Sequence, residues 1–252
     1  MGTYLNPSNN GFAEALRSKI YVDKTGLAGE MNGLLGTKQK YACVSRPRRF
    51  GKTMAVEMLT AYYSRGCDSR DLFASLEIAG EPSFETHLNK YNVIFLNTQS
   101  FLSRAERDAD RMIALMRDEL SAELRQSYSS INGLPLTRIL EWIYTETGIG
   151  FIIIIDEWDC VFREKGYDKA AREAYLDFLR DLLKDRDYTA LAYMTGILPI
   201  KKYGTHSALN MFSEYSMTDP QPLARYIGFT AGEVKRLCEK HSMDYGEITE
   251  WY

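Results

Sequence analysis

The sequence predicts an α/β fold in which helices flank a mainly parallel β-sheet. Short apolar runs alternate along the chain with longer segments of helical periodicity, as in β-α-β units joined by right-handed crossovers. The apolar run at 41–45 leads through a basic loop into a helical pattern, and the run at 151–155 ends in two acids. Because open α/β sheets bind ligands beyond the carboxyl ends of their strands, both features predict a site at that edge of the sheet.

The composition narrows the class of protein. The chain has 252 residues, of which 45% are hydrophobic and 26% charged, and this suits one large globular domain. Its net charge of −3 gives no global basic field for nucleic acid or an anionic membrane. The cysteines and histidines are scattered, which indicates reduced structural thiols and argues against a zinc site. Since the sequence shows neither a signal peptide nor an apolar run of roughly 20 residues, we expect a cytoplasmic protein that does not cross a membrane.

The first half of the chain is interpreted from its apolar runs and helix signals. Continuous apolarity predicts a strand buried on both faces, and apolar residues at spacings of three or four predict a helix. The helix after the basic loop has such a stripe, which we assign to core packing. In order, we expect a short helix after residue 7, a helix near 26–35, a strand at 40–45, a helix ending near 64, a turn-rich segment at 66–90, a strand at 92–98 and one long helix at 103–127.

Glycines and capping residues set the limits of the elements in the second half. Asn132-Gly133 ends the long helix, Gly148 is a C-terminal cap signal, and Thr230 followed by Glu233 forms a capping box. In order, we expect a helix at 134–148, a strand at 151–156, a helix at 168–185, a strand at 188–196, a loop at 201–222 with a short fifth strand near 214–217, and a helix at 229–241.

The loop SRPRRFGKT, at 45–53, has the strand-loop-helix context of a phosphate-binding P-loop, or Walker A motif. Backbone N–H groups would face the phosphates, Lys52 would reach the β/γ oxygens, and the Thr53 hydroxyl would bind Mg²⁺. The usual pattern, G-x-x-x-x-G-K-[ST], begins with a glycine where this sequence has Arg46. The predicted ATP-binding residues are Arg48, Arg49, Phe50, Gly51, Lys52, Thr53 and Met54.

The basic residues of this loop have several interpretations. Beside a P-loop, a cluster of Arg46, Arg48, Arg49 and Lys52 is most simply explained by the phosphate charge of a nucleotide, with a nucleic-acid contact as the alternative. Arg48 and Arg49 would brace phosphates within one chain, or one of them would act across an interface as an arginine finger. Loop structure and electrostatic support are the third interpretation.

The acids after the run at 151–155 have the character of a Walker B motif. Asp156 would hold Mg²⁺ directly or through water, and Glu157 would polarise the attacking water. The alternative is a buried strand whose acids cap the next helix. We expect Asp159 to be a helix N-cap rather than a second carboxylate of the site, and Trp158 to pack in the core.

Thr195 ends the predicted fourth strand, where a hydroxyl could sense the γ-phosphate and pass its presence to residues 197–217. This role requires the fourth strand to lie between the first and the third. The predicted catalytic residues are therefore Glu157, Lys52 and Thr195, and the predicted metal ligands are Thr53 and Asp156.

The strings YVDKT, SRPRRFGKT, IIIIDEWD, MTGILPIKK and GFTAGEV occur in this order, and together they resemble the bacterial AAA-ATPase-like family over nearly the whole chain. The resemblance implies a P-loop NTPase of the ASCE type with sheet order 5-1-4-3-2, and it makes Arg46 the family's own version of the loop. Members often continue through a WYDGY-like motif into a helical region and a PD-(D/E)XK nuclease-like domain. We therefore expect an ATPase domain at 1–222, and a helical C-terminal segment at 223–252 that is truncated within this motif at Trp251-Tyr252.

The functional prediction is an ATP-binding protein that hydrolyses ATP with Mg²⁺ and drives or gates a conformational change in a larger multidomain protein. One alternative is a nucleotide switch with negligible hydrolysis, and another is a nucleic-acid-associated ATPase coupled to the missing nuclease-like domain. A small-molecule phosphotransferase is less favoured, because the Asp-Glu pair suits water as the acceptor. Besides ATP, a second copy of the chain and a nucleic acid reached through the missing domain are the partner classes that remain open.

Overall fold

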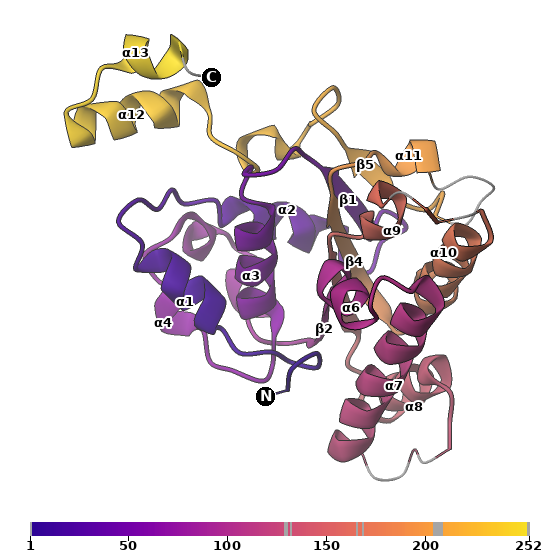
Figure 1. The fold of residues 1–252 in the computed structure, drawn as a ribbon. Helices are drawn as coiled ribbons and strands as arrows, with labels where there is room; N and C mark the ends of the chain where they lie inside the picture. The colour runs from indigo at the N-terminus through magenta and orange to yellow at the C-terminus, as the bar shows by residue number, and fades with distance from the viewer. Residues whose placement is uncertain are drawn as a thin grey trace.

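The computed structural model contains a five-stranded parallel sheet within the residues it describes, which are 2–128, 131, 133–164, 166–167, 169–203 and 209–250 (Figure 1). The strands are β1 (Tyr41–Ser45), β2 (Asn92–Asn97), β3 (Phe151–Asp156), β4 (Thr189–Gly196) and β5 (Ser213–Tyr215). Their order is β2-β3-β4-β1-β5, which confirms the predicted arrangement. It also places β4 between β1 and β3, as the proposed sensor role of Thr195 requires.

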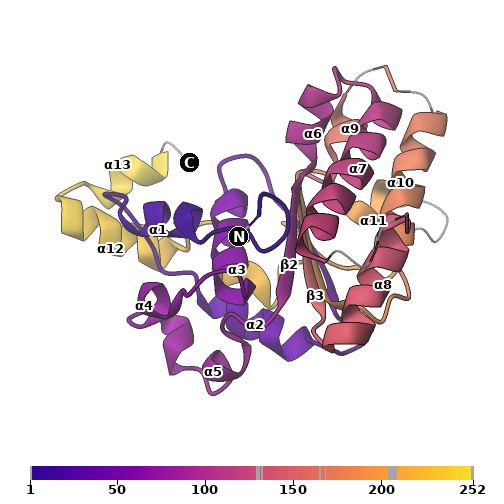
Figure 2. The same ribbon diagram turned by 90° about the horizontal axis from the view of Figure 1, so that it is seen from below.

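Helices cover both faces of the sheet. Figure 2 shows the helices from α1 to α5 on one side of the sheet and those from α6 to α10 on the other. None of the helices in the described part of the chain is long and apolar enough to cross a membrane. The helices are α1 (Asn10–Leu16), α2 (Gly26–Leu34), α3 (Lys52–Tyr63), α4 (Arg70–Phe73), α5 (Phe84–His87), α6 (Thr98–Arg104), α7 (Ala109–Ser127), α8 (Leu136–Thr147), α9 (Cys160–Arg163), α10 (Lys169–Leu183), α11 (Ile200–Tyr203), α12 (Ala231–His241) and α13 (Tyr245–Glu250), with 3-10 turns at Glu77–Gly80 and Leu223–Arg225.

The sheet separates two hydrophobic cores. All six residues of β3 are buried, and successive side chains point to opposite faces. Ile152 and Ile154 belong to the core that includes buried residues of α1, α2 and α3, whereas Ile153 and Ile155 belong to the core that includes those of α7, α8 and α10. This two-sided burial explains why the strand is apolar at every position from Phe151 to Ile155 rather than at alternate ones.

The edge strand β2 is covered by the N-terminal segment, for which the sequence predicted no element. Leu5 forms an antiparallel bridge with Ile94, and the backbone N–H of Asn6 donates to the carbonyl oxygen of Val93 at 2.7 Å. These contacts pair backbone groups that an open edge would leave free.

The prediction of one helix at 103–127 is wrong. The structure has α6 and α7 separated by a turn in which Glu106 and Arg107 adopt left-handed φ angles of 56° and 63°. A new helix then begins, with the carboxylate of Asp108 accepting from the N–H of Arg111 at 2.8 Å. The predicted strand at 92–98 likewise ends one residue early, because Asn97 caps α6.

The C-terminal helices α12 and α13 extend away from the sheet in Figure 1. The predicted capping box is confirmed, since Thr230 and Glu233 exchange hydrogen bonds at the start of α12. Glu233 also forms an ion pair of 2.7 Å with Lys24, which ties this region to the N-terminal part of the chain. The division into domains at 1–222 and 223–252 stays a prediction, and Trp251 and Tyr252 lie outside the described residues.

Candidate functional site

The predicted phosphate-binding loop joins β1 to α3. Gly51 occupies the N-cap position of α3 with φ 77° and ψ 15°, a left-handed conformation that costs an L-residue roughly 1–2 kcal/mol. No atom lies within 4 Å of where a Cβ would be at Gly51, so the backbone conformation rather than crowding requires glycine. Arg49 is also left-handed, with φ 69°. These angles direct the loop into the N-terminus of α3, where free backbone N–H groups favour an anion.

The basic character of Arg46, which stands in the place of the first glycine, suggested a contact with phosphate. In the structure its side chain binds the protein backbone instead. Its side chain is buried, and Nη1 donates to the carbonyl oxygens of Ser45 at 2.9 Å and Tyr215 at 2.6 Å. The guanidinium therefore joins the end of β1 to β5 beneath the loop.

Lys52 begins α3 and folds back into the loop. Its Nζ donates to the carbonyl oxygens of Arg46 at 3.0 Å and Pro47 at 2.9 Å, and only 5% of the residue is exposed. Burial lowers the pKa of Lys52, and the nearby carboxylates of Glu157 and Asp156 oppose this shift. The ammonium is thus held by two carbonyl oxygens of the loop.

The carboxylate of Asp156, at the end of β3, contacts side chains from the neighbouring elements. Thr53, from α3, donates its hydroxyl to Oδ2 at 3.2 Å, and Thr195, from β4, donates to Oδ1 through a short hydrogen bond. The side-chain amide of Asn97, at the end of β2, lies 3.5 Å from Oδ2. Complete burial raises the pKa of Asp156, and the hydrogen bonds from Thr195 and Thr53 offset part of this rise.

A sequence profile described as predicted AAA-ATPase matches residues 12–205 of this chain, which is most of its length. The chain belongs to the AAA-ATPase-like family. Membership and the fold together support ATPase-type nucleotide binding by this AAA-ATPase-like protein.

Individual relatives of this AAA-ATPase-like protein are distant. The "Uncharacterized protein in vnfD 5'region" of Azotobacter chroococcum mcd 1 is 24% identical over 243 residues, which cover 92% of this chain and 44% of that protein. The chain therefore spans less than half the length of this curated relative. Two solved structures are similar at 11% identity: the Aeropyrum pernix ORC2 protein (TM-score 0.44, 87% of this chain and 50% of that one) and C. elegans PCH-2 (TM-score 0.39, 89% and 47%).

Glu157 follows Asp156 with a left-handed φ of 57°. Its N–H donates to Oδ1 of Asp156 at 3.0 Å, and its carbonyl oxygen accepts from the hydroxyl of Thr98 at 2.6 Å. Its carboxylate Oε2 lies 2.5 Å from Nη2 of Arg163 in α9. The two acids therefore have different partners: Asp156 accepts from Thr53 and Thr195, whereas Glu157 pairs with Arg163.

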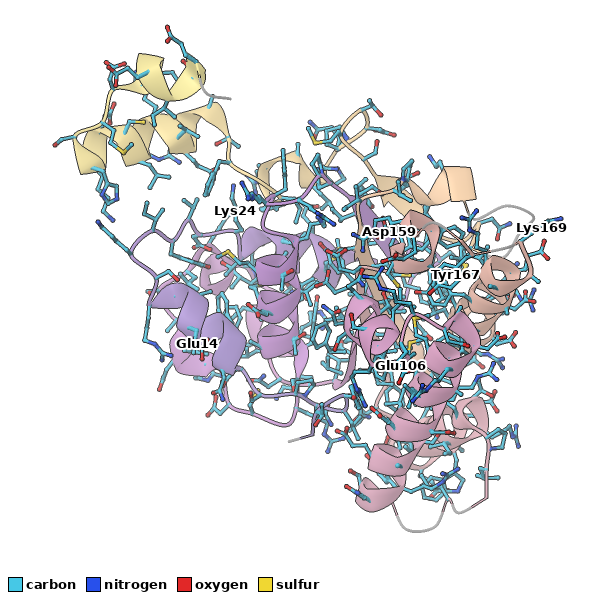
Figure 3. All side chains as sticks on the ribbon, viewed as in Figure 1. Glu14, Lys24, Glu106, Asp159, Tyr167 and Lys169 are labelled. Carbon is cyan, nitrogen blue, oxygen red and sulfur yellow. The ribbon has the colours of Figure 1, made fainter. Side chains whose placement is uncertain are left out.

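We expected the side chain of Asp159 to cap a helix. Asp159 does stand at the N-cap position of α9, but its side chain makes no capping hydrogen bond. Its Oδ2 instead accepts from the backbone N–H groups of Ile197 at 3.0 Å and Leu198 at 2.8 Å, and burial raises its pKa. Figure 3 labels Asp159 beside the upper ends of the strands. Trp158 is buried in the core, as predicted. These hydrogen bonds therefore connect the residues after β3 to the segment that follows Thr195.

The remaining predicted binding residues lie around the loop. Arg48 and Arg49 are exposed, and Met54 is 41% exposed on the first turn of α3. Phe50 is half-buried and packs so closely on Gly228 that a Cβ there would come within 2.9 Å of its ring. The loop thus contacts the segment that leads to α12.

Sequence reasoning did not assign Asn97, Thr98 or Arg163 to the site. Asn97 carries the signal that served for Asp156 and Thr195, a polar residue at the carboxyl end of a predicted strand, and it could have been found. Thr98 carries the same signal, since the predicted strand at 92–98 ends on it. Arg163 carries none, because its partners become neighbours only when α6 and α9 pack together.

The residues fit a magnesium ion bound together with a nucleotide. Among the described residues no cluster of His, Cys, Asp and Glu could hold a metal alone. Mg²⁺ in phosphate sites, however, takes one or two protein oxygens and completes its shell with phosphates and water. Neighbouring oxygens of an octahedral Mg²⁺ lie about 3 Å apart. The oxygens of Thr53 and Asp156, 3.2 Å apart, match this spacing.

Proposed function

We propose that this chain binds ATP with Mg²⁺ and hydrolyses it, and that hydrolysis changes the conformation of the segment after β4. The observation that carries the proposal is the convergence on Asp156 of hydroxyls from two other elements, Thr53 of α3 and Thr195 of β4. A loop with free N–H groups and a buried ammonium adjoins this point. The arrangement provides separate places for phosphate, metal and γ-phosphoryl group.

The binding roles follow from the charge and position of each residue. The N-terminus of α3 and the ammonium of Lys52 would bind the phosphates, and Gly51 lets the backbone approach them. Thr53 and Asp156 would hold Mg²⁺, which when bound neutralises phosphate charge and polarises the γ-phosphoryl group. Arg48 and Arg49, exposed on the outer side of the loop, would add positive charge, either for this chain's nucleotide or for that of a second copy.

Glu157 would orient the attacking water and accept its proton. Its carboxylate is 22% exposed, so water can reach it, and it adjoins the acid that would hold the metal. In an in-line displacement the carboxylate must face the side of the γ-phosphate opposite the leaving oxygen. The different partners of the two acids, Thr53 and Thr195 for Asp156 and Arg163 for Glu157, support this division of roles.

Thr195 would link the nucleotide to the rest of the chain. A γ-phosphate that accepts the Thr195 hydroxyl would remove it from Asp156. Two residues later, Ile197 and Leu198 donate their N–H groups to Asp159 in the segment after β3. Movement at the end of β4 therefore alters hydrogen bonds in the catalytic segment, and such coupling would suit a larger multidomain protein.

A nucleotide switch with negligible hydrolysis is the second candidate. The specific observation in its favour is the ion pair of Glu157 with Arg163, which engages Oε2 of the carboxylate and lowers its availability as a base. A switch of this kind would bind ATP with the same residues and would need no free base.

Steady-state phosphate release separates these candidates. The wild-type chain with ATP and Mg²⁺ is expected to release phosphate, and Glu157→Gln is expected to slow release by roughly 10²-fold or more while still binding ATP. Glu164→Gln is a matched control, because Glu164 pairs with the exposed Arg107 at 2.6 Å. Release at the background rate by a wild-type chain that binds ATP would favour the switch instead.

A further inference from the structure

Arg163, the last residue of α9, is surrounded by three oxygen acceptors. Its Nη2 lies 2.5 Å from Oε2 of Glu157 and donates to Oε1 of Gln99 at 3.2 Å. Nε lies 3.4 Å from Oδ1 of Asp159, an ion-pair contact in which neither atom makes a hydrogen bond to the described residues. The guanidinium therefore bridges the predicted base, α6 and the N-terminus of α9.

This ion pair is more shielded than a typical surface pair. The side chains of Arg163 and Glu157 are 17% and 22% exposed, whereas Arg107, which pairs with the next residue after Arg163, is 70% exposed. Asp159 is completely buried and is itself held by the N–H groups that follow Thr195. A shielded guanidinium that Gln99 also holds favours one direction of the carboxylate that it binds.

Only one oxygen of the Glu157 carboxylate is engaged. Oε2 binds Arg163, and Oε1 makes no recorded hydrogen bond among the described residues. Hydrogen bonds from Thr98 and to Asp156 fix the backbone of Glu157. The carboxylate is thus anchored by one oxygen, while the other remains available to accept a proton from water.

We propose that Arg163 is a positioning residue for ATP hydrolysis, which holds Glu157 in the orientation that activates water. The inference rests on the proposed function, since it assigns Glu157 as the base. Without the guanidinium, the carboxylate would rotate about its side-chain bonds, and misplacement by about 1 Å can cost roughly 10²-fold in rate. Arg163 would not contact the substrate, so ATP affinity would stay unchanged.

The competing explanation is purely structural, in which Arg163 joins α9 to α6 and fixes Asp159. This role would lower thermal stability, and any loss of turnover would be independent of Glu157. A double-mutant cycle separates the two explanations, because a positioning residue has no further effect once the group that it positions has been removed.

The test compares Arg163→Met, Arg163→Lys, Glu157→Gln and the double variant, with Arg107→Met as the control. We expect Arg163→Met to lower kcat by about 10²-fold and to leave the Kd for ATP within about twofold. Arg163→Lys keeps a charge near Oε2 and should recover part of the rate. In the Glu157→Gln background, Arg163→Met should change turnover by less than about threefold.

Several results would overturn the inference. They are wild-type turnover in Arg163→Met, an equal loss in both backgrounds, or a weakened Kd for ATP that shows the guanidinium acting on the nucleotide. ATP binding by each variant shows that it is folded. Activity of the wild-type chain tests the proposed function separately: an inactive wild type rejects both claims, whereas an active wild type with an unaffected Arg163→Met variant rejects only this one.

Discussion

Lys52→Ala is the substitution with the most direct consequence for binding. The structure places the ammonium 3.0 and 2.9 Å from two loop carbonyl oxygens, in a position almost closed to solvent. ATP must draw this ammonium from the carbonyls to its β/γ oxygens. Alanine removes the buried charge and leaves the loop N–H groups and the exposed arginines to bind the phosphates.

The magnitude follows from the hydrogen bonds exchanged. A hydrogen bond to a charged group is worth about 1.5–3 kcal/mol. When ATP binds, the ammonium exchanges two carbonyl contacts for contacts with charged phosphate oxygens, so Lys52→Ala should lose binding free energy on the order of 3 kcal/mol. Since 1.4 kcal/mol is a factor of ten, the Kd for ATP should rise by about 10²-fold. The ligand-free variant should also be less stable by about 1–2 kcal/mol, because two loop carbonyls lose their donor.

Isothermal titration calorimetry with ATP and Mg²⁺ measures this effect. Lys38→Ala is the control, since Lys38 is exposed and precedes β1 at the opposite end of the strand. Equal ATP affinities for the wild type and Lys52→Ala would refute the assignment of the loop, whatever the thermal stabilities.

Three further substitutions test other parts of the site. Asp156→Asn should bind ATP without the gain in affinity that Mg²⁺ gives the wild type, and a calorimetric Mg²⁺ dependence equal to wild type would count against the metal role. The same variant should melt at a higher temperature when free of ligand, because burial disfavours the charge of Asp156. Thr195→Val removes one hydrogen bond and should reduce kcat by about tenfold with little change in ATP affinity, so unchanged kinetics would exclude the sensor role. Burial alone would raise the pKa of Glu233, but hydrogen bonds from Lys24 and Thr230 outweigh it and hold this pKa below its ordinary 4.5. The stabilisation is therefore present above about pH 4.5 and is lost in more acidic solution. Urea denaturation should show Glu233→Gln about 1 kcal/mol less stable at neutral pH, with the difference closing in acid, and a constant difference would contradict this origin.

The parts of the fold that were predictable depend on local sequence. β3 is apolar from Phe151 to Ile155 because both of its faces are buried, and this pattern can be recognised without a structure. Its carboxyl end places Asp156 at the edge where parallel strands gather ligands, so the contacts with Thr53 and Thr195 followed from the strand order.

The parts that were not predictable depend on distant partners or on backbone angles. Arg46 has the appearance of a phosphate ligand, and only the position of β5 beside β1 shows that its guanidinium binds the carbonyl of Tyr215. The break before α7 occurs at Glu106 and Arg107, two residues with no strong preference for the left-handed angles that they adopt. A helical pattern runs through both, so the sequence alone favoured one continuous helix.

Single-turnover hydrolysis of radiolabelled ATP tests the central claim most directly. An excess of enzyme binds ATP with Mg²⁺, the reaction is quenched at successive times, and the bound nucleotide is identified as ATP or ADP. The account predicts conversion to ADP by the wild type and persistence of intact bound ATP in Glu157→Gln. Equal conversion by both chains, or no conversion by a wild-type chain saturated with ATP, would contradict hydrolysis at this site by Glu157.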